Sequence, residues 1–533
     1  MISWGMHTKT YRPWSPHQPF LLPPCPDEWL PEGHLVYFLL DLVEQLDLSA
    51  IEAPIQAKDP RGERPYDPRM MVTLLLYAYC VGIPSSRRIQ RATYEHVAFR
   101  VISGGNHPHF TRICAFRREH FGALEELFMQ VLRLCRAAGL ASLGHVSLDG
   151  SKFKANASKH KAMSYDRMQS TSERLDAEIG ELLQRAEAVD AAEDELYGEG
   201  AEQEDLPDEL RRRESRLARI RAAMTELEQD AKKTRAAELR AQAAGHRETA
   251  ATHPDPTVRK RAATNAVKRE AGARDLLDDH DDDAGDGDGP DGATTPESAG
   301  DDGATEAVEA AVSAQRTPLP RHETPATPAG EPRPKAQRNF TDPDSRIMEH
   351  QGGFLQGYNG QLAVDEDHQI IVAAALTNQA PDTYHLVPLL EQVRANCGAL
   401  PSKATADTGY WAPSNAQWCD DHGVDAYIAT GRMKRGWARE PPAGGEPPPD
   451  ADARERMRHK INTGEGREIY KQRKCVPEPV FGQIKEARGF RQLLHRGIEK
   501  ARCEFSLICT GHNIWKLFRN ADGGRFDPAW TTP

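Results

Sequence analysis

Apolar residues recur at three- and four-residue intervals through most of the first 140 residues, which is the spacing of amphipathic helices. Residues 33–48 and 68–83 show this pattern, and Pro68 stands where the first turn of a helix tolerates proline. A further helical pattern begins after Thr111 and continues to residue 140. The pattern therefore predicts an all-helical N-terminal domain over residues 1–140.

A break at residues 82–84 separates two of these helices, and Ser85 or Ser86 is a suitable N-cap for the second. This arrangement predicts a helix-turn-helix, a motif that can place a helix in a DNA groove. Arginines are frequent on this helix and on the one that follows Thr111. The candidate DNA-binding residues of the domain are Arg87, Arg88, Arg91, Arg112, Arg117 and Arg118.

Residues 163–274 are dominated by Ala, Glu, Arg and Leu, a composition typical of long helices with charged faces. We predict a coiled-coil-like insertion here, an antiparallel pair of helices joined at residues 198–208. Residues 275–336 are rich first in Asp and Gly and then in Thr, Pro and Ala, and such a composition cannot bury a core. We expect a disordered acidic and Pro-rich linker over this range.

Strand patterns stand on both sides of the insertion. Residues 141–162 contain a short apolar run that ends at Asp149, and residues 355–365 and 368–377 form a predicted hairpin. Helical and strand patterns then alternate along the chain, which predicts a mixed sheet covered by helices. Residues 141–162 and 337–533 would thus form one α/β core that the insertion interrupts.

Charge is unevenly distributed along the 533 residues. Residues 275–306 carry eleven Asp and two Glu with no Lys or Arg. The formal net charge of the whole chain is −12, so the remaining residues together are near neutral. Residues 85–120 hold seven Arg against two Glu, and residues 454–502 hold fourteen Lys or Arg against six Glu. Such clusters favour a phosphate backbone as partner, with a solvated basic face as the alternative for any one of them.

The cysteines and the apolar runs bear on the environment of the protein. Nine cysteines are scattered without a CxxC pair, which disfavours a zinc module or a disulfide framework and favours a reduced, cytoplasmic protein. The longest apolar run, residues 70–83, has 14 residues and is too short to span a membrane. We therefore expect no membrane partner.

Three acids stand where polar ligands collect in an α/β sheet, at strand ends or helix starts. Asp149 and Asp407 each end a strand-like run and are followed by a turn-forming Gly within two residues. Glu478 lies between Pro477 and Pro479, so we expect it at the N-cap of a helix or just outside it. Carboxylates that converge in this way could hold divalent metal ions.

Other acids could compete for this role. Asp342 and Asp344 occur in an Asp-Pro-Asp-Ser sequence, which indicates first a turn with side-chain to backbone hydrogen bonds. Asp365 and Asp367 flank the predicted hairpin turn, where we expect solvated side chains.

Together these motifs resemble the DDE-type transposases of bacterial insertion sequences, in the branch with a Tyr, Arg, Glu and Lys signature around the third acid. The signature residues here are Tyr470, Arg473, Glu478 and Lys485. Four residues separate Arg473 from Glu478 where the family pattern usually has three, so Lys474 is an alternative for the Arg position. The resemblance also rests on LDGSKF around Asp149, DPDSRIM, GYNGQLAVD, TADTGYW around Asp407 and EPVFGQIKEARGF.

The resemblance implies a ribonuclease H-like core with a catalytic triad of Asp149, Asp407 and Glu478. These carboxylates would hold two divalent ions, Mg²⁺ or alternatively Mn²⁺, of which one activates a water or 3′-hydroxyl and the other stabilises the leaving oxygen. Neighbouring side chains would contact the DNA end and its phosphates, namely Lys152, Lys154, Tyr470, Arg473 and Lys485.

The implied function is a transposase that binds the terminal inverted repeats of its insertion sequence and catalyses metal-dependent DNA cleavage and strand transfer. Its partner would be double-stranded DNA, both element ends and target, and it would act in the cytoplasm, at the nucleoid when bound. A homodimer would bring two ends together, with the helical insertion as a candidate assembly surface. The alternatives are a catalytically inactive DNA-binding relative and a nuclease of the same fold without strand transfer.

Overall fold

The computed structural model describes residues 28–57, 64–197, 208–278, 319–350, 352–431 and 441–531. The chain divides into two compact units. Unit 1 comprises Met1–Ala78, Ile83–Glu119 and Phe518–Ala529, and unit 2 comprises Tyr79–Gly82, His120–Leu517 and Trp530–Pro533.

Unit 1 is built from short amphipathic helices, as the apolar spacing predicts. They are α1 (Leu35–Glu44), α2 (Ser49–Gln56), most of α3 (Pro68–Cys80), α4 (Ser86–Glu95), α5 (Val97–Ser103) and α6 (Phe110–Glu119). Phe38 is fully buried, and its ring lies 5.5 Å from that of Phe518 and 5.7 Å from that of Phe526. Helix α4 begins after the N-cap Ser85, one of the two predicted caps.

The structure divides the chain before the predicted domain boundary at residue 140. Helix α7 (Phe121–Ala137) belongs to unit 2, where it contacts α17 (Ile498–Asn520). The Ser506 hydroxyl of α17 donates a hydrogen bond to the Glu125 carbonyl of α7 at 3.3 Å. Periodicity identifies a helix, but it does not indicate which core buries the apolar face of that helix.

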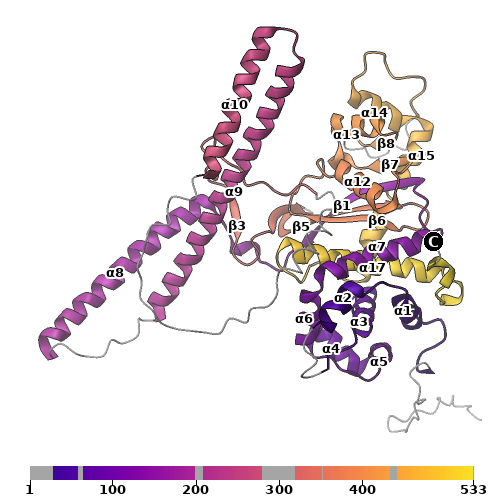
Figure 1. The fold of residues 1–533 in the computed structure, drawn as a ribbon, viewed down its shortest axis with the longest axis horizontal. Helices are drawn as coiled ribbons and strands as arrows, with labels where there is room; N and C mark the ends of the chain where they lie inside the picture. The colour runs from indigo at the N-terminus through magenta and orange to yellow at the C-terminus, as the bar shows by residue number, and fades with distance from the viewer. Residues whose placement is uncertain are drawn as a thin grey trace, which may run out of the picture. The chain divides into compact units, whose positions relative to one another are not determined.

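The core of unit 2 is a mixed six-stranded sheet (Figure 1), in the order β4-β5-β1-β7-β8 with β6 also paired to β5. Strand β1 (His145–Lys154) is antiparallel to β5 (Gly353–Asp365) and parallel to β7 (Lys403–Ala406), which is parallel to β8 (Asp425–Ile428). The predicted hairpin is confirmed as β5 and β6 (Ile371–Thr377). This mixed α/β arrangement is consistent with a ribonuclease H-like core.

Helices cover this sheet. Helix α12 (Leu386–Cys397) packs on β5 and β6, and α13 (Pro413–Asp421), α14 (Ala453–Asn462) and α15 (Gly464–Gln472) contact β8. Helix α16 (Pro477–Gly482) contacts β1 and β5. Asn513 of α17 hydrogen bonds to both the amide and the carbonyl of Ile371, each at 2.9 Å, and so fixes α17 to β6.

Strand β4 (Arg346–His350) pairs with the start of β5 and was not predicted. Its five residues, RIMEH, are too few for a clear alternation of apolar and polar positions.

The insertion between β1 and the rest of the sheet contains three long helices instead of the predicted pair. These are α8 (Tyr165–Tyr197), α9 (Asp208–Thr252) and α10 (Pro256–Asp278). The first half of α9 packs against α8, and the second half of α9 packs against α10 (Figure 1). Pro254 and Pro256 stand at the break between α9 and α10, and they are a helix-start signal that the predicted pair left out of account. Of the predicted connection at residues 198–208, residues 198–207 lie outside the described residues.

The predicted disorder at residues 275–336 is wrong at its C-terminal end. Residues 319–336 are ordered, with buried Leu319, Thr324 and Ala336 and a β-bridge between Ala326 and Pro332. The segment leads into β3 (Gln337–Asn339), which pairs with β2 (Ala162–Ser164). Neighbouring elements bury its few apolar side chains, an effect that the composition of the segment alone cannot reveal. Residues 279–318 lie outside the described residues.

Within the described part of the chain, no helix is both long and apolar enough to cross a membrane. The eight cysteines located there are all free thiols.

Candidate active site

Asp149 lies in the middle of β1, just beyond the point where β1 and β7 cease to pair at Ser147. The predicted strand end and turn at Gly150 are wrong, because β5 continues to pair with β1 as far as Lys154. A Cβ at position 150 would lie 2.5 Å from the Gln361 Nε2 atom, so a larger residue there would displace the Gln361 side chain. Asp149 is thus held on a rigid strand with one edge open.

Asp407 directly follows β7, as predicted. Its carboxylate accepts a hydrogen bond from the Gly409 amide at 2.8 Å and caps the 3-10 turn Thr408–Tyr410. Because β1 and β7 are parallel neighbours, Asp149 and Asp407 lie towards the same end of two adjacent strands.

Glu478 lies inside the first turn of α16, two positions beyond the N-cap where it was predicted. The N-cap is Val476, and Pro477 begins the helix. Proline is well tolerated there, because the first-turn amides have no partner within the helix. The Glu478 side chain is 50% exposed, and its Oε1 lies 3.3 Å from the Arg473 guanidinium.

Arg473 is the cation that the three acids share. Burial raises the pKa of Asp149 to about 7; Arg473 opposes this rise, and the negative charges of Asp407 and Glu478 add to it. Burial also raises the pKa of Asp407, against the Gly409 hydrogen bond and Arg473. The carboxylates from β1, the end of β7 and α16 therefore share one electrostatic environment.

A fourth acid, Asp382, was not identified from the sequence. Its Oδ1 accepts hydrogen bonds from the side-chain amides of Asn359 and Gln361, both at 2.7 Å, and lies 3.4 Å from the Lys152 ammonium. Its charge also raises the pKa of Asp407. The signal available in the sequence was its place shortly after a strand, because β6 ends at Thr377.

Lys152 and Lys485, two of the predicted phosphate contacts, are bound by the protein itself. Lys152 donates to the Ala380 carbonyl at 2.7 Å. Lys485 donates to the Ser151 hydroxyl at 2.5 Å and to the Lys152 carbonyl at 2.7 Å. Burial lowers the pKa of Lys485 to about 8, and Asp149 opposes this change. Lys485 therefore fixes β1 at Ser151 and Lys152, the two residues that follow Gly150.

Arg473, and not the alternative Lys474, faces the acids. The Arg473 side chain is 14% exposed and pairs with Glu478, whereas Lys474 is exposed. Tyr470 of α15 is buried, and the Arg473 guanidinium lies 5.9 Å from the centre of its ring. Tyr470 thus supports Arg473 and offers little surface for a contact with DNA.

Helix α4 presents its arginines to solvent. Arg87, Arg88 and Arg91 are exposed, while Ile89 and Ala92 on the other face are buried. The Arg87 guanidinium lies 4.8 Å from the centre of the Phe110 ring.

The predicted arginines of helix α6 differ in their exposure to solvent. Arg112 and Arg118 are exposed. Arg117 is 3% exposed and donates a hydrogen bond to the Pro84 carbonyl at 2.6 Å, so the prediction that it contacts DNA is wrong. The sequence does not show which of two adjacent arginines faces the core.

The competing acids have structural roles. Asp342 is fully buried and accepts hydrogen bonds from the Tyr358 hydroxyl at 2.8 and 2.9 Å, within a turn as predicted. The prediction that Asp365 is solvated is wrong, because it is fully buried and accepts a hydrogen bond from the Leu143 amide at 2.9 Å. Asp367 is exposed.

Among the residues described, no group of three or more His, Cys, Asp or Glu side chains is arranged to hold a metal ion. The donor chemistry nevertheless fits Mg²⁺, because the acids that influence Asp149 and Asp407 offer only carboxylate oxygens. Arg473 supplies positive charge to this group in the present arrangement.

Two family models match the chain. Residues 448–518 match a transposase DDE domain, and residues 24–119 match a transposase domain (DUF772). The first match covers Tyr470, Arg473, Glu478 and Lys485, and the second covers the arginines of α4 and α6. Asp149 and Asp407 lie outside both matches. No curated protein and no solved structure matches the chain.

Proposed function

We propose that this chain, whose two family-model matches support a DDE-type transposase of an insertion sequence, binds the terminal inverted repeats of its element and catalyses DNA cleavage and strand transfer there. Asp149, Asp407 and Glu478 would form the catalytic triad. The observation that carries this proposal is the shared electrostatic environment of three carboxylates from distant parts of the sequence, next to Arg473.

The triad would hold two Mg²⁺ ions, with Mn²⁺ as an alternative, because all its donors are carboxylate oxygens. When bound, such ions supply an activated oxygen nucleophile and stabilise the charge of the leaving oxygen. Asp149 and Asp407 would contribute ligands from the rigid sheet, and Glu478 from the start of α16.

Arg473 and Lys485 would assist in different ways. Arg473 pairs with Glu478, and it would bind a phosphate of the DNA end once that carboxylate acquires another partner. Lys485 is a positioning residue in this proposal, because it holds the backbone of Lys152 and the side chain of Ser151 close to Asp149.

Recognition of the element ends is assigned to the exposed arginines of unit 1, on α4 and α6. Double-stranded DNA is the partner that suits such a basic helical surface. Transposition requires two ends in one complex, so we also propose a homodimer as the active form.

The test replaces Glu478 by Gln and uses duplexes that carry the inverted repeats flanking the gene. We expect Glu478→Gln to bind the duplex like wild type and to lose Mg²⁺-dependent cleavage by at least about a hundredfold. Glu486→Gln is the matched control, because Glu486 is exposed and forms its ion pair with Arg491 instead of Arg473. Cleavage by Glu478→Gln at the wild-type rate would contradict the proposal.

The wild-type protein distinguishes the two alternatives in the same assay. An inactive DNA-binding relative would bind the duplex and cut nothing in Mg²⁺ or Mn²⁺. A nuclease of the same fold would cut the ends but join none of the released 3′-hydroxyls to target DNA.

A further inference from the structure

We propose that a second site in unit 2, the β1-end pocket, binds a DNA strand about five base pairs from the scissile phosphate. The β1-end pocket is the cavity where β1 ends, lined by Lys154, Lys159, His160, Lys161, Phe354 and Arg496 among others. The proposal rests on the proposed function, because it assumes that Asp149 marks the site of cleavage. Of these residues, only Lys154 was among the predicted DNA contacts.

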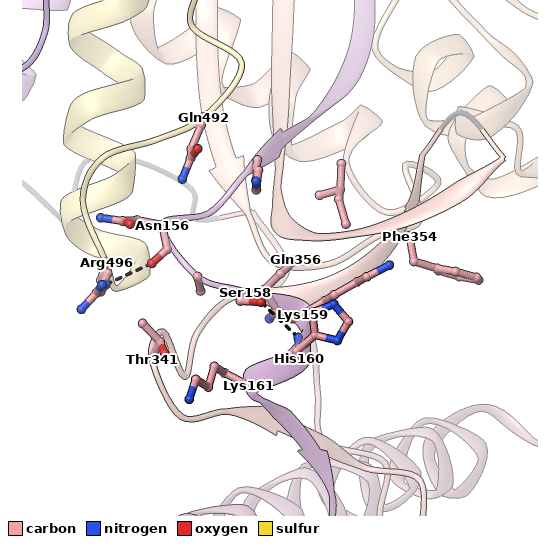
Figure 2. A pocket seen from close by; sticks show the side chains of 13 residues that line it. Asn156, Ser158, Lys159, His160, Lys161, Thr341, Phe354, Gln356, Gln492 and Arg496 are labelled. Carbon is pink, nitrogen blue, oxygen red and sulfur yellow. Dashed lines mark hydrogen bonds between the residues drawn. The ribbon is translucent and has the colours of Figure 1, made fainter.

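The charge of the pocket favours a polyanion. Figure 2 shows the pocket, whose volume is about 670 Å³. Four Lys or Arg residues and one His line it, and none of its lining residues is Asp or Glu. Within the described residues these four cations have no ion pair with a carboxylate, so their charge is available to a ligand. Phosphates that meet such a surface release their condensed counterions.

The backbone that carries these cations is well fixed. Lys154 pairs with the segment after α16: its amide donates to the Arg491 carbonyl at 3.1 Å, and its carbonyl accepts from the Leu493 amide at 2.9 Å. The Lys161 carbonyl accepts from the Phe340 amide at 3.1 Å. Arg496 donates to the Asn156 carbonyl at 3.0 Å (Figure 2). The backbone that carries these cations therefore needs little ordering on binding.

An exposed aromatic ring adds a second type of contact. Phe354 lies near the start of β5 at the pocket wall, and it is 64% exposed, which is unusual for phenylalanine. Aromatic rings beside a positively charged groove are a recurring platform for nucleic-acid bases. A simple inorganic anion would use the lysines but would gain nothing from Phe354, so we favour a nucleic-acid strand as the ligand.

Strand geometry gives the distance from the site of cleavage. Lys154 follows Asp149 by five residues on the same uninterrupted strand. A strand rises about 3.3 Å per residue, so the two Cα atoms are about 17 Å apart along β1. For a duplex that runs along β1, with a rise of about 3.4 Å per base pair, this distance corresponds to about five base pairs.

The test measures DNA binding by Lys159→Ala/Lys161→Ala and, separately, by Phe354→Ala, each made in the full chain with Glu478→Gln so that the duplex stays intact. All three side chains are exposed, so we expect unchanged melting temperatures. The double lysine variant should lower the slope of log affinity against log salt by about 2. Phe354→Ala should weaken binding by about fivefold or more at constant slope.

The matched control is Lys260→Ala/Lys268→Ala on α10, which removes the same charge from exposed positions. It should leave the slope unchanged. Ethylation of single phosphates should locate the contact. Ethylation about five base pairs from the cut should weaken binding of the control and leave binding of the double lysine variant unchanged.

The β1-end pocket would be overturned as a DNA site by an unchanged salt slope in the Lys159→Ala/Lys161→Ala variant. It would also be overturned if ethylation of the same phosphates weakened binding of this variant and of the control. This failure differs from failure of the proposed function. In the latter case the parent protein would not bind the terminal-repeat duplex, or wild type would not cut it.

Discussion

Asp149 illustrates how single residues balance charge at the candidate site. Burial raises its pKa to about 7, the negative charges of Asp407 and Glu478 add to this rise, and Arg473 offsets only part of it. Lys152 and Asp382 form a second pair nearby, at 3.4 Å. Around Asp149 four carboxylates, with Asp407, Glu478 and Asp382, therefore face three cations, Arg473, Lys152 and Lys485, an imbalance that divalent cations would relieve.

The first prediction concerns the pH dependence of metal binding. Asp149 must lose its proton to bind a cation, and its raised pKa means that protons compete below about pH 7. We expect the Mg²⁺ or Mn²⁺ concentration for half-maximal thermal stabilisation to rise about tenfold for each unit of pH below 7 and to stay constant above it. Asp149→Asn should abolish the stabilisation, and a dependence that lies wholly below pH 5 would contradict the argument.

The raised pKa of Asp149 should also make the unfolding free energy of the metal-free protein depend on pH. The folded state keeps the proton of Asp149 up to about pH 7, whereas the unfolded chain releases it near the ordinary pKa of 3.8. The unfolding free energy should therefore fall as pH rises through this window. The fall should be smaller in Asp149→Asn when both proteins are unfolded by urea in EDTA.

A further prediction concerns Asp382, which we assign as a positioning residue. Asp382→Asn removes the charge that faces Lys152 and leaves this lysine without its compensating carboxylate. We expect the rate constant of cleavage to fall by roughly tenfold or more with duplex affinity retained, because active sites depend on exact placement. Asp382→Asn should also lower the melting temperature, and the double variant Lys152→Met/Asp382→Asn should recover part of that loss. Asp420→Asn is the matched control. Full activity in Asp382→Asn would contradict the role.

What could be predicted at this scale depended on local context. Asp149, Asp407 and Glu478 stand beside glycines and prolines that are visible in the sequence. Asp365 and Arg117 do not differ in the sequence from surface residues, yet tertiary hydrogen bonds bury both. Asp382 has no periodic neighbours, and its role became visible only through partners on β1 and β5.

At the scale of elements, strands and helices were predicted well where their pattern was long. Strands β5 and β6 and helix α3 appear where the spacing of apolar positions indicated. The end of β1 was missed because Gly150 and the following lysines resemble a turn, whereas pairing with β5 keeps the strand extended. This continuation past Asp149 is also what forms the β1-end pocket.

The helical insertion gives a prediction at this scale. Leu227 of α9 is 1% exposed in a cluster with Met168 and Leu175 of α8. We expect Leu227→Ala to lower the unfolding free energy of the insertion by about 2–4 kcal/mol. Leu183→Ala is the control, because Leu183 of α8 is 40% exposed, and it should change the stability by less than about 0.5 kcal/mol. Urea titration followed by far-UV circular dichroism measures both, and equal losses would contradict the packing of α8 on α9.

At the scale of the whole molecule, two basic surfaces belong to different units. The arginines of α4 lie in unit 1, and the candidate site and the β1-end pocket lie in unit 2. The two matches to transposase domains likewise cover parts of the chain that are far apart in sequence. Composition indicated both basic clusters but not the assignment of α7 and residues 518–529, which depends on long-range contacts.

This division predicts that recognition and chemistry can be separated. Arg87→Ala/Arg88→Ala should weaken binding to the terminal-repeat duplex and lower its salt slope by about 2, because two phosphate contacts are lost. Cleavage of the duplex at saturating protein should proceed at the wild-type rate. Arg64→Ala/Arg69→Ala, which also removes two exposed positive charges from unit 1, is the control. Unchanged binding by the α4 variant would remove α4 from the recognition surface.

The most direct test of the central claim is iron-directed cleavage of the protein backbone. Fe²⁺ can take the place of Mg²⁺ among oxygen ligands, and with ascorbate and peroxide it cuts the chain close to where it binds. We predict that the full-length protein is cut near Asp149, Asp407 and Glu478 together, and that excess Mg²⁺ suppresses all three cuts in parallel. Cuts near only one of these residues, or cuts that Mg²⁺ does not suppress, would contradict the claim that the three carboxylates share one metal site.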